Sequence, residues 1–291
     1  MDKPRIGIIG GTGLGDALGE RLENVTAEQP DTPFGKPSGP IYIGTIGANR
    51  IAFISRHGRG HRFHPSQVPY AANIFALKQL GVTTLISSGA VGSLRQEIIP
   101  KDLVIVDQFI DKTFRRQNSF FDQHGAVHVE LAHPCCGRLR ERLLTAGEKA
   151  ACRVHTAGTY VCMEGPQFST RAESLMHRQW GGDLIGMTAL PEAKLAREAQ
   201  MCYALVALAS DYDCWREHDP GKDKQSLLQE IIGNLTAATQ NAIDLIERLL
   251  ESDGGLADET CPCRKSLELA VWTKADAIDP RQRDQLAVLF E

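Results

Sequence analysis

Residues 199–215 read AQMCYALVALASDYDCW. The first eleven are apolar except for Gln200, and an apolar run that ends on polar residues is typical of a buried strand leading into a site. Asp211 and Asp213 stand two positions apart at its end. Their carboxylates lie on one side if the strand continues and diverge if the chain turns. Burial raises a carboxyl pKa, so either group can hold a proton there. The alternative is a surface turn, where aspartate is common.

Predicted strands alternate with predicted helices along most of the chain. We expect strands at 5–10, 41–46, 50–55, 81–88, 103–107, 158–163, 183–187 and 199–209, and helices at 66–80, 170–180, 190–199, 224–250, 266–272 and 280–289. This alternation predicts a single α/β domain with a mixed, largely parallel central sheet flanked by helices. We place that domain at 1–250 and a loop with a short helical C-terminal extension at 251–291.

Composition narrows the function. The chain has 291 residues and a formal net charge of −4, which argues against nucleic acid or an anionic membrane as its partner. Its apolar stretches are too short to span a membrane. The first residues pass directly into a glycine-rich segment with no signal-peptide pattern, so the cytoplasm is the expected compartment.

Seven of the eight cysteines fall into two groups, and the eighth, Cys214, lies in the stretch quoted above. Three lie in or beside apolar segments and are predicted to be small core residues: Cys152, Cys162 and Cys202. Cys135 and Cys136 are adjacent, and Cys261 and Cys263 flank one proline. A zinc site built from these two pairs is conceivable, but structural zinc sites prefer wider spacing within each pair. A disulfide between Cys261 and Cys263 would close a very small ring, and their pairing stays open.

A glycine-rich turn follows the first predicted strand, in the order Gly11-Thr12-Gly13-Leu14-Gly15. A dinucleotide fold needs glycines at i, i+2 and i+5, which no register supplies, and a phosphate-binding P-loop would need lysine where Asp16 stands. An NAD-dependent enzyme is therefore disfavoured. What remains is a glycine-rich turn with the hydroxyl of Thr12 at its centre. The backbone N–H groups of such a turn can hold a small anion.

Basic residues follow another predicted strand, in the stretch Ser55-Arg56-His57-Gly58-Arg59-Gly60-His61. Arginine offers a planar fork to phosphate oxygens, whereas the alternative is a solvated basic loop. Ligands of such sheets bind at the carboxyl ends of the strands, so we expect the residues at those ends to share one cleft. These are Thr12, Arg56, His57, Ala90, Met163, Thr188 and Asp211.

Five motifs together resemble the trimeric purine nucleoside phosphorylase family, and within it the members that act on 5′-methylthioadenosine. They are GGTG at 10–13, SRHGRGH at 55–61, EGPQFS at 164–169, MT at 187–188 followed by Pro191-Glu192, and SDYDCW at 210–215. The resemblance covers residues 5–250. It implies a pentosyltransferase of purine and methionine salvage that converts 5′-methylthioadenosine and phosphate into adenine and 5-methylthioribose 1-phosphate. It also implies a homotrimer in which a neighbouring chain closes the 5′ pocket, with phosphate as co-substrate and neither a cofactor nor a metal.

The resemblance also implies residue roles. Phosphate would be held by Thr12, Arg56, His57, Ala90 and Thr188. Met187 would lie under the ribose, Phe168 near the purine, Ser169 close to the base, and His128 near the 5′ substituent. Asp211 would donate a proton to N7, and Asp213 would accept from the 6-amino group. Outside this family, Phe168 and Met187 would be read as core residues and His128 as a surface histidine.

The acidic pair predicts the choice of base. A 6-amino group donates a hydrogen bond to an ionised Asp213, whereas a 6-oxo group would be repelled, and relatives preferring 6-oxopurines carry asparagine at the first acidic position. One departure is Gly89, where the family often has a hydroxyl residue, so we expect weaker phosphate binding unless Ser88 substitutes. The alternatives are a phosphorylase with broader 6-aminopurine or methylthioinosine preference, and a non-catalytic nucleoside-binding protein.

Overall fold

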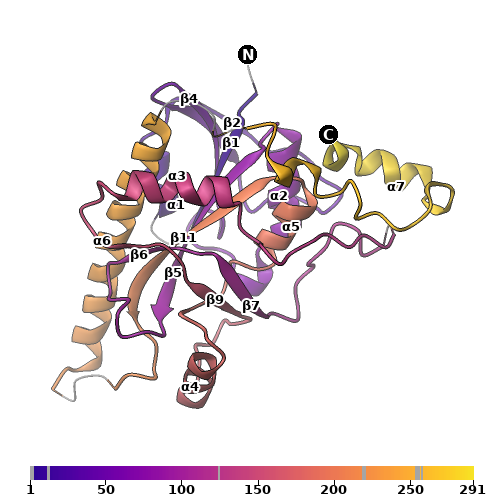
Figure 1. Ribbon diagram of the computed structural model, residues 1–291. Helices are drawn as coiled ribbons and strands as arrows, with labels where there is room; N and C mark the ends of the chain where they lie inside the picture. The colour runs from indigo at the N-terminus through magenta and orange to yellow at the C-terminus, as the bar shows by residue number, and fades with distance from the viewer. Residues whose placement is uncertain (1–2, 12–13, 124, 218–220, 253–255, 257) are drawn as a thin grey trace.

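The strands form one mixed sheet, with helices packed on both of its faces (Figure 1). The computed structural model describes residues 3–11, 14–123, 125–217, 221–252, 256 and 258–291. The strands are β1 (Ile6–Gly10), β2 (Glu23–Glu28), β3 (Ile41–Ile46), β4 (Asn49–Ser55), β5 (Thr84–Ser93), β6 (Leu103–Ile105), β7 (Gln108–Lys112), β8 (Val154–His155), β9 (Thr159–Met163), β10 (Leu184–Gly186) and β11 (Cys202–Tyr212). The helices are α1 (Leu14–Gly19), α2 (Tyr70–Gln79), α3 (Gly137–Gly147), α4 (Arg171–Gln179), α5 (Glu192–Glu198), α6 (Lys224–Glu251) and α7 (Pro280–Gln285).

The strand order confirms the predicted mixed, largely parallel sheet. The order is β2-β3-β4-β1-β5-β10-β9-β7, while β11 pairs with β5 and β6, and β8 pairs with β6. β1 lies parallel to both β4 and β5, and β11 runs parallel to β5 from Cys202 opposite Thr84 onward. The apolar stretch that follows Gln200 is therefore a central strand, buried from Cys202 to Ser210.

Apolar side chains fill the space on both faces of the sheet. α2, α5 and parts of the C-terminal segment cover one face, with Phe75, Leu195 and Leu289 in its core. α1, α3 and α6 cover the other face, where Leu143 and Ile246 are completely buried. Burying one such side chain stabilises the fold by about 1.5–3 kcal/mol. Residues 262–290 thus share the core of the main body.

The helix that follows the EGPQFS motif has a well-defined start. Thr170 caps α4 by accepting from the N–H of Glu173, and the Glu173 side chain accepts from the N–H of Thr170. This reciprocal pair satisfies two N–H groups that a helix start leaves open. It fixes the point at which the 164–169 segment turns into α4, and so where Phe168 and Ser169 can lie.

Several predicted elements differ from the structure. The 266–272 helix was wrong: a short 3-10 turn, Pro262–Lys265, is followed by turns, because the backbone of residues 270–272 pairs with residues 126–128 through the Val127–Val271 bridge. The 280–289 helix is α7 followed by a 3-10 turn at Ala287–Phe290. β2 and α3 were missed, since β2 is exposed and α3 buries only Leu139 and Leu143.

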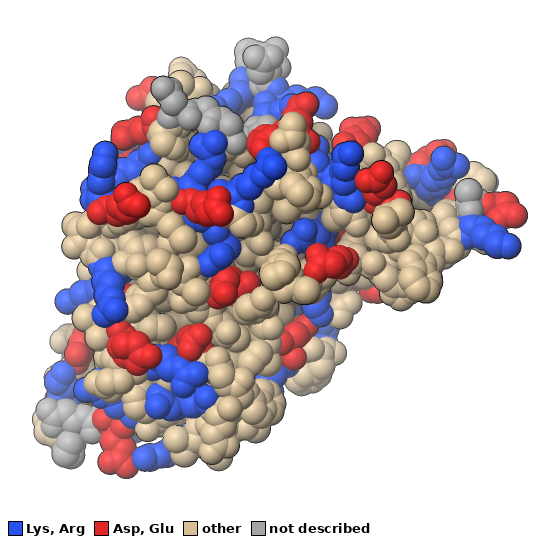
Figure 2. Space-filling model, in the orientation of Figure 1, with Lys and Arg blue, Asp and Glu red and all other residues tan. Residues whose placement is uncertain are grey.

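The surface carries both signs of charge. On the face shown in Figure 2, acidic and basic side chains are interspersed. Within the described residues, none of the helices has the length and apolar character required to cross a membrane.

Candidate active site

The carboxyl ends of β1, β4 and β5 meet at one edge of the sheet. β1 and β4 stay in register to their last pair, Gly10 opposite Ser55, and the N–H of Arg56 donates to the carbonyl of Gly10 at 2.9 Å. Gly11 is packed so closely that a Cβ atom would lie 2.7 Å from the carbonyl oxygen of Ser88 and 2.8 Å from Nη1 of Arg56. Only glycine therefore fits here without moving the arginine. Thr12 lies outside the described residues.

A buried ion pair occupies this edge. Nε and Nη2 of Arg56 donate to the two carboxylate oxygens of Glu192, at 2.8 and 3.1 Å, and both side chains are almost completely buried. Nη2 also donates to Ser87 Oγ at 2.6 Å, and Nη1 to the carbonyl of Ser88 at 2.8 Å. A guanidinium has five N–H hydrogens. Within the described residues, four are used and one on Nη1 is left for a ligand.

The carboxylate of Glu192 has further donors. Ser87 Oγ and the hydroxyl of Tyr203, at 3.0 Å, both donate to Oε1. Burial lowers the pKa of Arg56, but the carboxylate of Glu192 outweighs it and raises that pKa above the ordinary value. The guanidinium therefore stays charged, and its orientation is fixed before any substrate binds.

His57 is held as a neutral imidazole. Burial, and next the charge of Arg56, lower its pKa to about 4. Its Nδ1 lies 2.8 Å from the carbonyl oxygen of Phe63, which can only accept, so the proton is on Nδ1 and Nε2 is an acceptor. A neutral acceptor binds a phosphate that still carries a proton better than it binds the dianion.

Thr188 lies beside the middle of β5, next to Gly89. It follows β10, and its N–H donates to the hydroxyl of Tyr160 at 3.3 Å. A Cβ atom added to Gly89 would lie 3.4 Å from Thr188 Oγ1, an ordinary contact distance. Ala90 is next on β5 and is partly buried. Arg56 and His57 thus follow the end of β4 and Thr188 follows β10, whereas Ala90, which was predicted to follow a strand, lies inside β5, because that strand continues to Ser93.

Sequence reasoning missed an arginine that organises the adjacent loops. Nη1 of Arg116 donates to the carbonyls of Met187 and Leu190, at 2.6 and 2.5 Å, and Nη2 donates to the carbonyl of Glu164 at 2.7 Å. Its side chain is buried beside the carboxylate of Glu164. The available signal was the basic run 112–116, which composition alone does not distinguish from a solvated loop.

Glu164 is the acidic partner in this arrangement. Burial alone would raise its pKa, but Ser66, the N–H of Phe114 at 2.7 Å and Arg116 together lower that pKa to about 2. The first residue of the EGPQFS motif is therefore an ionised anchor for the loop. Glu192, from the Pro191-Glu192 motif, has the same function for Arg56.

A β-bulge at Ser210 lies directly before the first aspartate of the SDYDCW motif. Ala209 pairs with Val91 and Asp211 with Gly92, so Ser210 is an extra residue. The hydroxyl of Ser210 donates to Asp211 Oδ1 at 2.6 Å. Asp211 borders a hollow of about 480 Å³ on the α6 side, together with Lys101 and Asn234.

Asp213 has different surroundings. A Cβ atom on Gly92 would lie 3.3 Å from Asp213 Cβ, and the N–H of Asp213 donates to the carbonyl of Ser93 at 3.0 Å. Its Oδ2 atom is buried with no hydrogen-bond partner among the described residues. Nδ1 of the nearby His177 is also buried with no partner among the described residues. Burial and the charge of Lys112 lower the pKa of His177, and the carboxylate of Asp213 partly offsets this effect. Unsatisfied buried polar atoms mark a place where a ligand can bind.

The segment 168–174 is tied to the same motif. The thiol of Cys214 donates to the carbonyl of Ser169 at 3.3 Å, and the N–H of Trp215 donates to Ser174 Oγ at 3.2 Å. Ser169 Oγ contacts the sulfur of Met163 at 3.6 Å. Phe168 is 86% exposed, so its ring is not part of the core.

His128 is bound to the C-terminal extension. Its N–H donates to the carbonyl of Ala270 at 2.9 Å, and its ring meets Trp272 edge-on with 5.2 Å between centroids. It borders a hollow of about 330 Å³ together with Lys194 and Glu198. Among the residues that the structure describes, none of the other predicted site residues lines this hollow.

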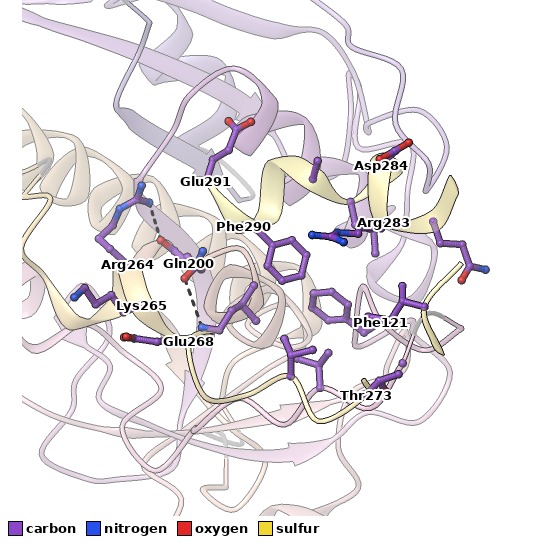
Figure 3. Close-up of a pocket in the computed structure, with 18 residues that line it drawn as sticks. Phe121, Gln200, Arg264, Lys265, Glu268, Thr273, Arg283, Asp284, Phe290 and Glu291 are labelled. Carbon is purple, nitrogen blue, oxygen red and sulfur yellow. Dashed lines mark hydrogen bonds between the residues drawn. The ribbon is translucent and has the colours of Figure 1, made fainter. Parts of the chain in front are cut away.

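A further cavity of about 730 Å³ lies between the C-terminal extension and the main body (Figure 3). Phe121 and Phe290 face each other in it, and Arg264 donates to the carbonyl of Gln200 at 2.7 Å. Of the predicted site residues in the described part of the chain, none belongs to its lining. The residues predicted to bind phosphate and the base therefore lie elsewhere, at or near the strand ends described above.

Fold and site together define an α/β enzyme. A buried arginine at the strand ends is preformed to bind an anion, and the segment with Asp211 and Asp213 lies on the side where a purine base would bind. The chain belongs to the Phosphorylase superfamily, whose family model matches residues 5–251. It is 44% identical over 289 residues to the S-methyl-5'-thioadenosine phosphorylase of Geobacter sulfurreducens, with 98% of this chain and 97% of that protein covered. The corresponding enzyme of Danio rerio is 43% identical over 268 residues, covering 90% and 94%.

Solved structures give the same relationship. A methylthioadenosine phosphorylase from an Antarctic soil metagenomic library superposes with a TM-score of 0.89 at 40% identity, over the full length of both chains. A mutant adenosine/methylthioadenosine phosphorylase of Schistosoma mansoni in complex with methylthioadenosine has a TM-score of 0.79 at 33% identity, covering 87% of this chain and 93% of that one.

Proposed function

We propose that the chain catalyses phosphorolysis of 5′-methylthioadenosine, which yields adenine and 5-methylthioribose 1-phosphate. The observation that carries the proposal is the buried Arg56–Glu192 edge, with a charged guanidinium and one donor left for an anion. Family membership and relatives named for this substrate support it.

The phosphate half of the site would act by charge and position. As the glycosidic bond breaks, positive charge builds on the ribose and negative charge on the purine. Phosphate held under C1′ by Nη1 of Arg56, the hydroxyl of Thr188 and the N–H of Ala90 would stabilise the ribose cation. Thr12 would add a further hydroxyl, and His57 would accept from a phosphate that carries a proton. Fixing both reactants in this way also removes much of the entropic barrier.

The base half would bind and protonate the leaving group. Asp213, with its unpartnered buried Oδ2, would accept from the 6-amino group. Asp211 would donate the proton to N7, with Ser169 close to the base, Phe168 against the purine ring and Met187 under the ribose. Proton donation to the departing base is general acid catalysis, which typically contributes about 10²–10⁴-fold.

The working enzyme would be a homotrimer in the cytoplasm that uses phosphate as its co-substrate and no organic cofactor. Phe168 and Trp272 are 86% and 73% exposed, which favours an interface for a neighbouring chain at these places. His128, on the exposed segment beside Trp272, would then reach the 5′ substituent bound to the neighbour. Light scattering of the purified protein tests this: a mass three times 31.9 kDa is expected, and a monomer that is fully active contradicts it.

A phosphate-dependent assay tests the reaction itself. Adenine release from methylthioadenosine, adenosine and inosine is measured side by side, with and without phosphate. We expect turnover only with phosphate, in the order methylthioadenosine, adenosine, inosine. Equal rates on inosine would indicate a broader purine phosphorylase, and binding without adenine release would indicate a non-catalytic homologue.

The variant Asp211→Asn tests the acid. We expect it to lose turnover of adenine nucleosides and to gain some turnover of 6-oxopurine nucleosides. Unchanged kinetics on methylthioadenosine would exclude Asp211 as the proton donor.

A further inference from the structure

Four buried cysteines gather at a place remote from the predicted phosphate and base residues. The sulfur atoms of Cys136, Cys202, Cys261 and Cys263 all lie within 4.8 Å of one another. Each residue is at most 6% exposed. Cys202 was predicted to be a core residue, and Cys135, which was considered as a possible ligand, is not in the group. We call these four residues the cysteine cluster.

The ligands come from three separate parts of the chain. Cys136 stands directly before α3, where its side chain makes no capping hydrogen bond, and Cys202 is the first residue of β11. Cys261 and Cys263 lie at the start and in the middle of the short 3-10 turn of the C-terminal extension. Two ligands therefore belong to the main body and two belong to the extension. The sequence did not reveal this set, because the spacing within the pairs matters less than where the fold places them.

The spacing of the sulfurs suits a tetrahedral metal. Zinc–sulfur bonds of about 2.3 Å place two sulfurs of a tetrahedral site about 3.8 Å apart. Sγ of Cys136 and Sγ of Cys261 are 3.6 Å apart. A disulfide would require sulfurs at about 2.0 Å. Four thiolates arranged around a common centre are the ligand set of structural zinc sites.

The surroundings can balance the charge of such a centre. Four thiolates and one Zn²⁺ carry a net charge of −2, so nearby cations are needed. Nη1 of Arg197 donates to Sγ of Cys263 at 3.7 Å. The N-terminal end of α3, at Cys136, adds the positive end of its helix dipole. A hollow of about 260 Å³ borders Cys136, Cys202 and Cys261 and provides a route for an ion to enter.

We infer that the cysteine cluster is a structural zinc site that fastens the C-terminal extension to the main body. Zinc with four protein ligands has no open position, so its role is to hold the fold and not to take part in phosphorolysis. The extension contacts residues that precede β11: Arg264 donates to the carbonyl of Gln200, and Ser266 Oγ to the carbonyl of Arg197. Metal binding would thus fix the segment from which the central strand starts.

Elemental analysis of the full-length protein is the direct test. The protein is purified without chelator and without a metal-affinity step, and its zinc and iron are measured per chain. We expect about one zinc per chain, and removal by a chelator after thiol modification should release it in full. Substitution with Co²⁺ should produce the visible absorption of a tetrahedral thiolate site. Iron in place of zinc, or no metal with all four thiols free, would overturn the inference.

Mass spectrometry under non-reducing conditions distinguishes the remaining alternative. Two disulfides within the cluster would lower the mass of the chain by four hydrogens and leave no metal, and this result would also overturn the inference. A chain of unaltered mass that holds zinc supports it.

Two neighbouring variants provide a matched pair. Cys136→Ala should lose at least nine-tenths of the bound zinc, and its melting temperature should fall by about 5–10 °C and no longer respond to a chelator. Cys135→Ala, which removes an equally buried thiol outside the cluster, should keep its zinc and its response to the chelator. Equal zinc content in the two variants would contradict the site, whatever the effect of either substitution on folding.

Discussion

The candidate site has a phosphate half and a base half, and the two differ in whether their buried polar groups already have hydrogen-bond partners. At the phosphate edge, Arg56, Glu192 and Ser87 satisfy one another in a buried network. On the base side, Oδ2 of Asp213 and Nδ1 of His177 are buried without partners among the described residues, and Phe168 projects into solvent. The first half is preorganised for a small ion, whereas the second half is completed by what binds to it.

This difference has an energetic meaning. A network that is satisfied before binding stabilises the free protein, and removing one member leaves the other buried and uncompensated. A buried oxygen without a partner destabilises the free protein by about 1–3 kcal/mol, and a ligand that donates to it recovers that energy. Substitutions in the two halves should therefore separate stability from activity.

The largest effect is expected for Arg56→Ala. Leaving the carboxylate of Glu192 buried without its partner should lower the free energy of unfolding by about 3–5 kcal/mol and abolish phosphorolysis. Urea unfolding and the phosphate-dependent assay measure the two effects. In the double variant Arg56→Met with Glu192→Leu, stability should recover while activity stays lost. If stability does not recover, the pair is not the source of the loss.

Asp213→Asn should produce the opposite pattern. We expect kcat/KM for methylthioadenosine to fall about 100–1000-fold, equivalent to about 2.7–4 kcal/mol, because the acceptor for the 6-amino group is lost. The free energy of unfolding should change by less than about 1 kcal/mol, since the amide fills the same volume and one buried polar atom stays without a partner, as before. Asp276→Asn, on the exposed extension, is the control and should change neither quantity. A marked loss of stability in Asp213→Asn would mean that the base half is satisfied after all.

Acid should weaken the phosphate half through His57. Its pKa is lowered to about 4, against 6.5 for the unperturbed group, so the unfolded chain binds a proton that the folded chain does not. Stability is therefore full above pH 6.5 and is lost as the pH falls toward 4, by up to about 3 kcal/mol. Glu198 has the opposite effect on stability. Burial raises its pKa to about 7, so its contribution to the free energy of unfolding increases as the pH falls.

Comparing the wild-type protein with the His57→Asn variant isolates the contribution of His57 to the pH dependence of stability. Urea unfolding of both proteins at pH 7, 5 and 4 should show a difference in stability that shrinks as the pH falls. A constant difference would show that His57 does not titrate within this window.

The smallest effect is expected at Gly89. A Cβ at this position has an ordinary contact of 3.4 Å with Thr188 Oγ1, so a serine fits without displacing the edge. Gly89→Ser should add a hydroxyl to the phosphate half and lower KM for phosphate about 3–10-fold, with KM for the nucleoside unchanged. A raised KM for phosphate would show that the hydroxyl points elsewhere.

Much of the fold was predictable because its signals are local. The alternation of apolar runs and polar helices predicted the mixed α/β sheet, and β11 was recognised by its unbroken apolar character. β2 is exposed along its length, so no apolar alternation marked it. The 266–272 segment pairs through its backbone with residues 126–128, and a local helical pattern does not reveal such a long-range contact.

The site was predictable only in part, because its supports are distant in sequence. Arg56 was identified from its motif, but its partner Glu192 lies 136 positions away. Arg116 donates to four backbone carbonyls of two other segments, 163–164 and 187–190, and no local pattern encodes such contacts. β11 ends at Tyr212, so Asp211 lies on the strand and Asp213 lies beyond it, and the spacing of the two acids does not encode this boundary.

Trp215 gives the base half an optical property. The guanidinium of Arg178 lies over its ring at 3.7 Å, and its indole N–H donates to the carbonyl of Ser93 at 2.8 Å. The chain has three tryptophans, and the other two are Trp180 and Trp272. With both of those replaced by phenylalanine, the emission spectrum of Trp215 becomes an intrinsic fluorescent probe. Titration with adenine or with phosphate alone then shows which ligand perturbs the indole, without any turnover.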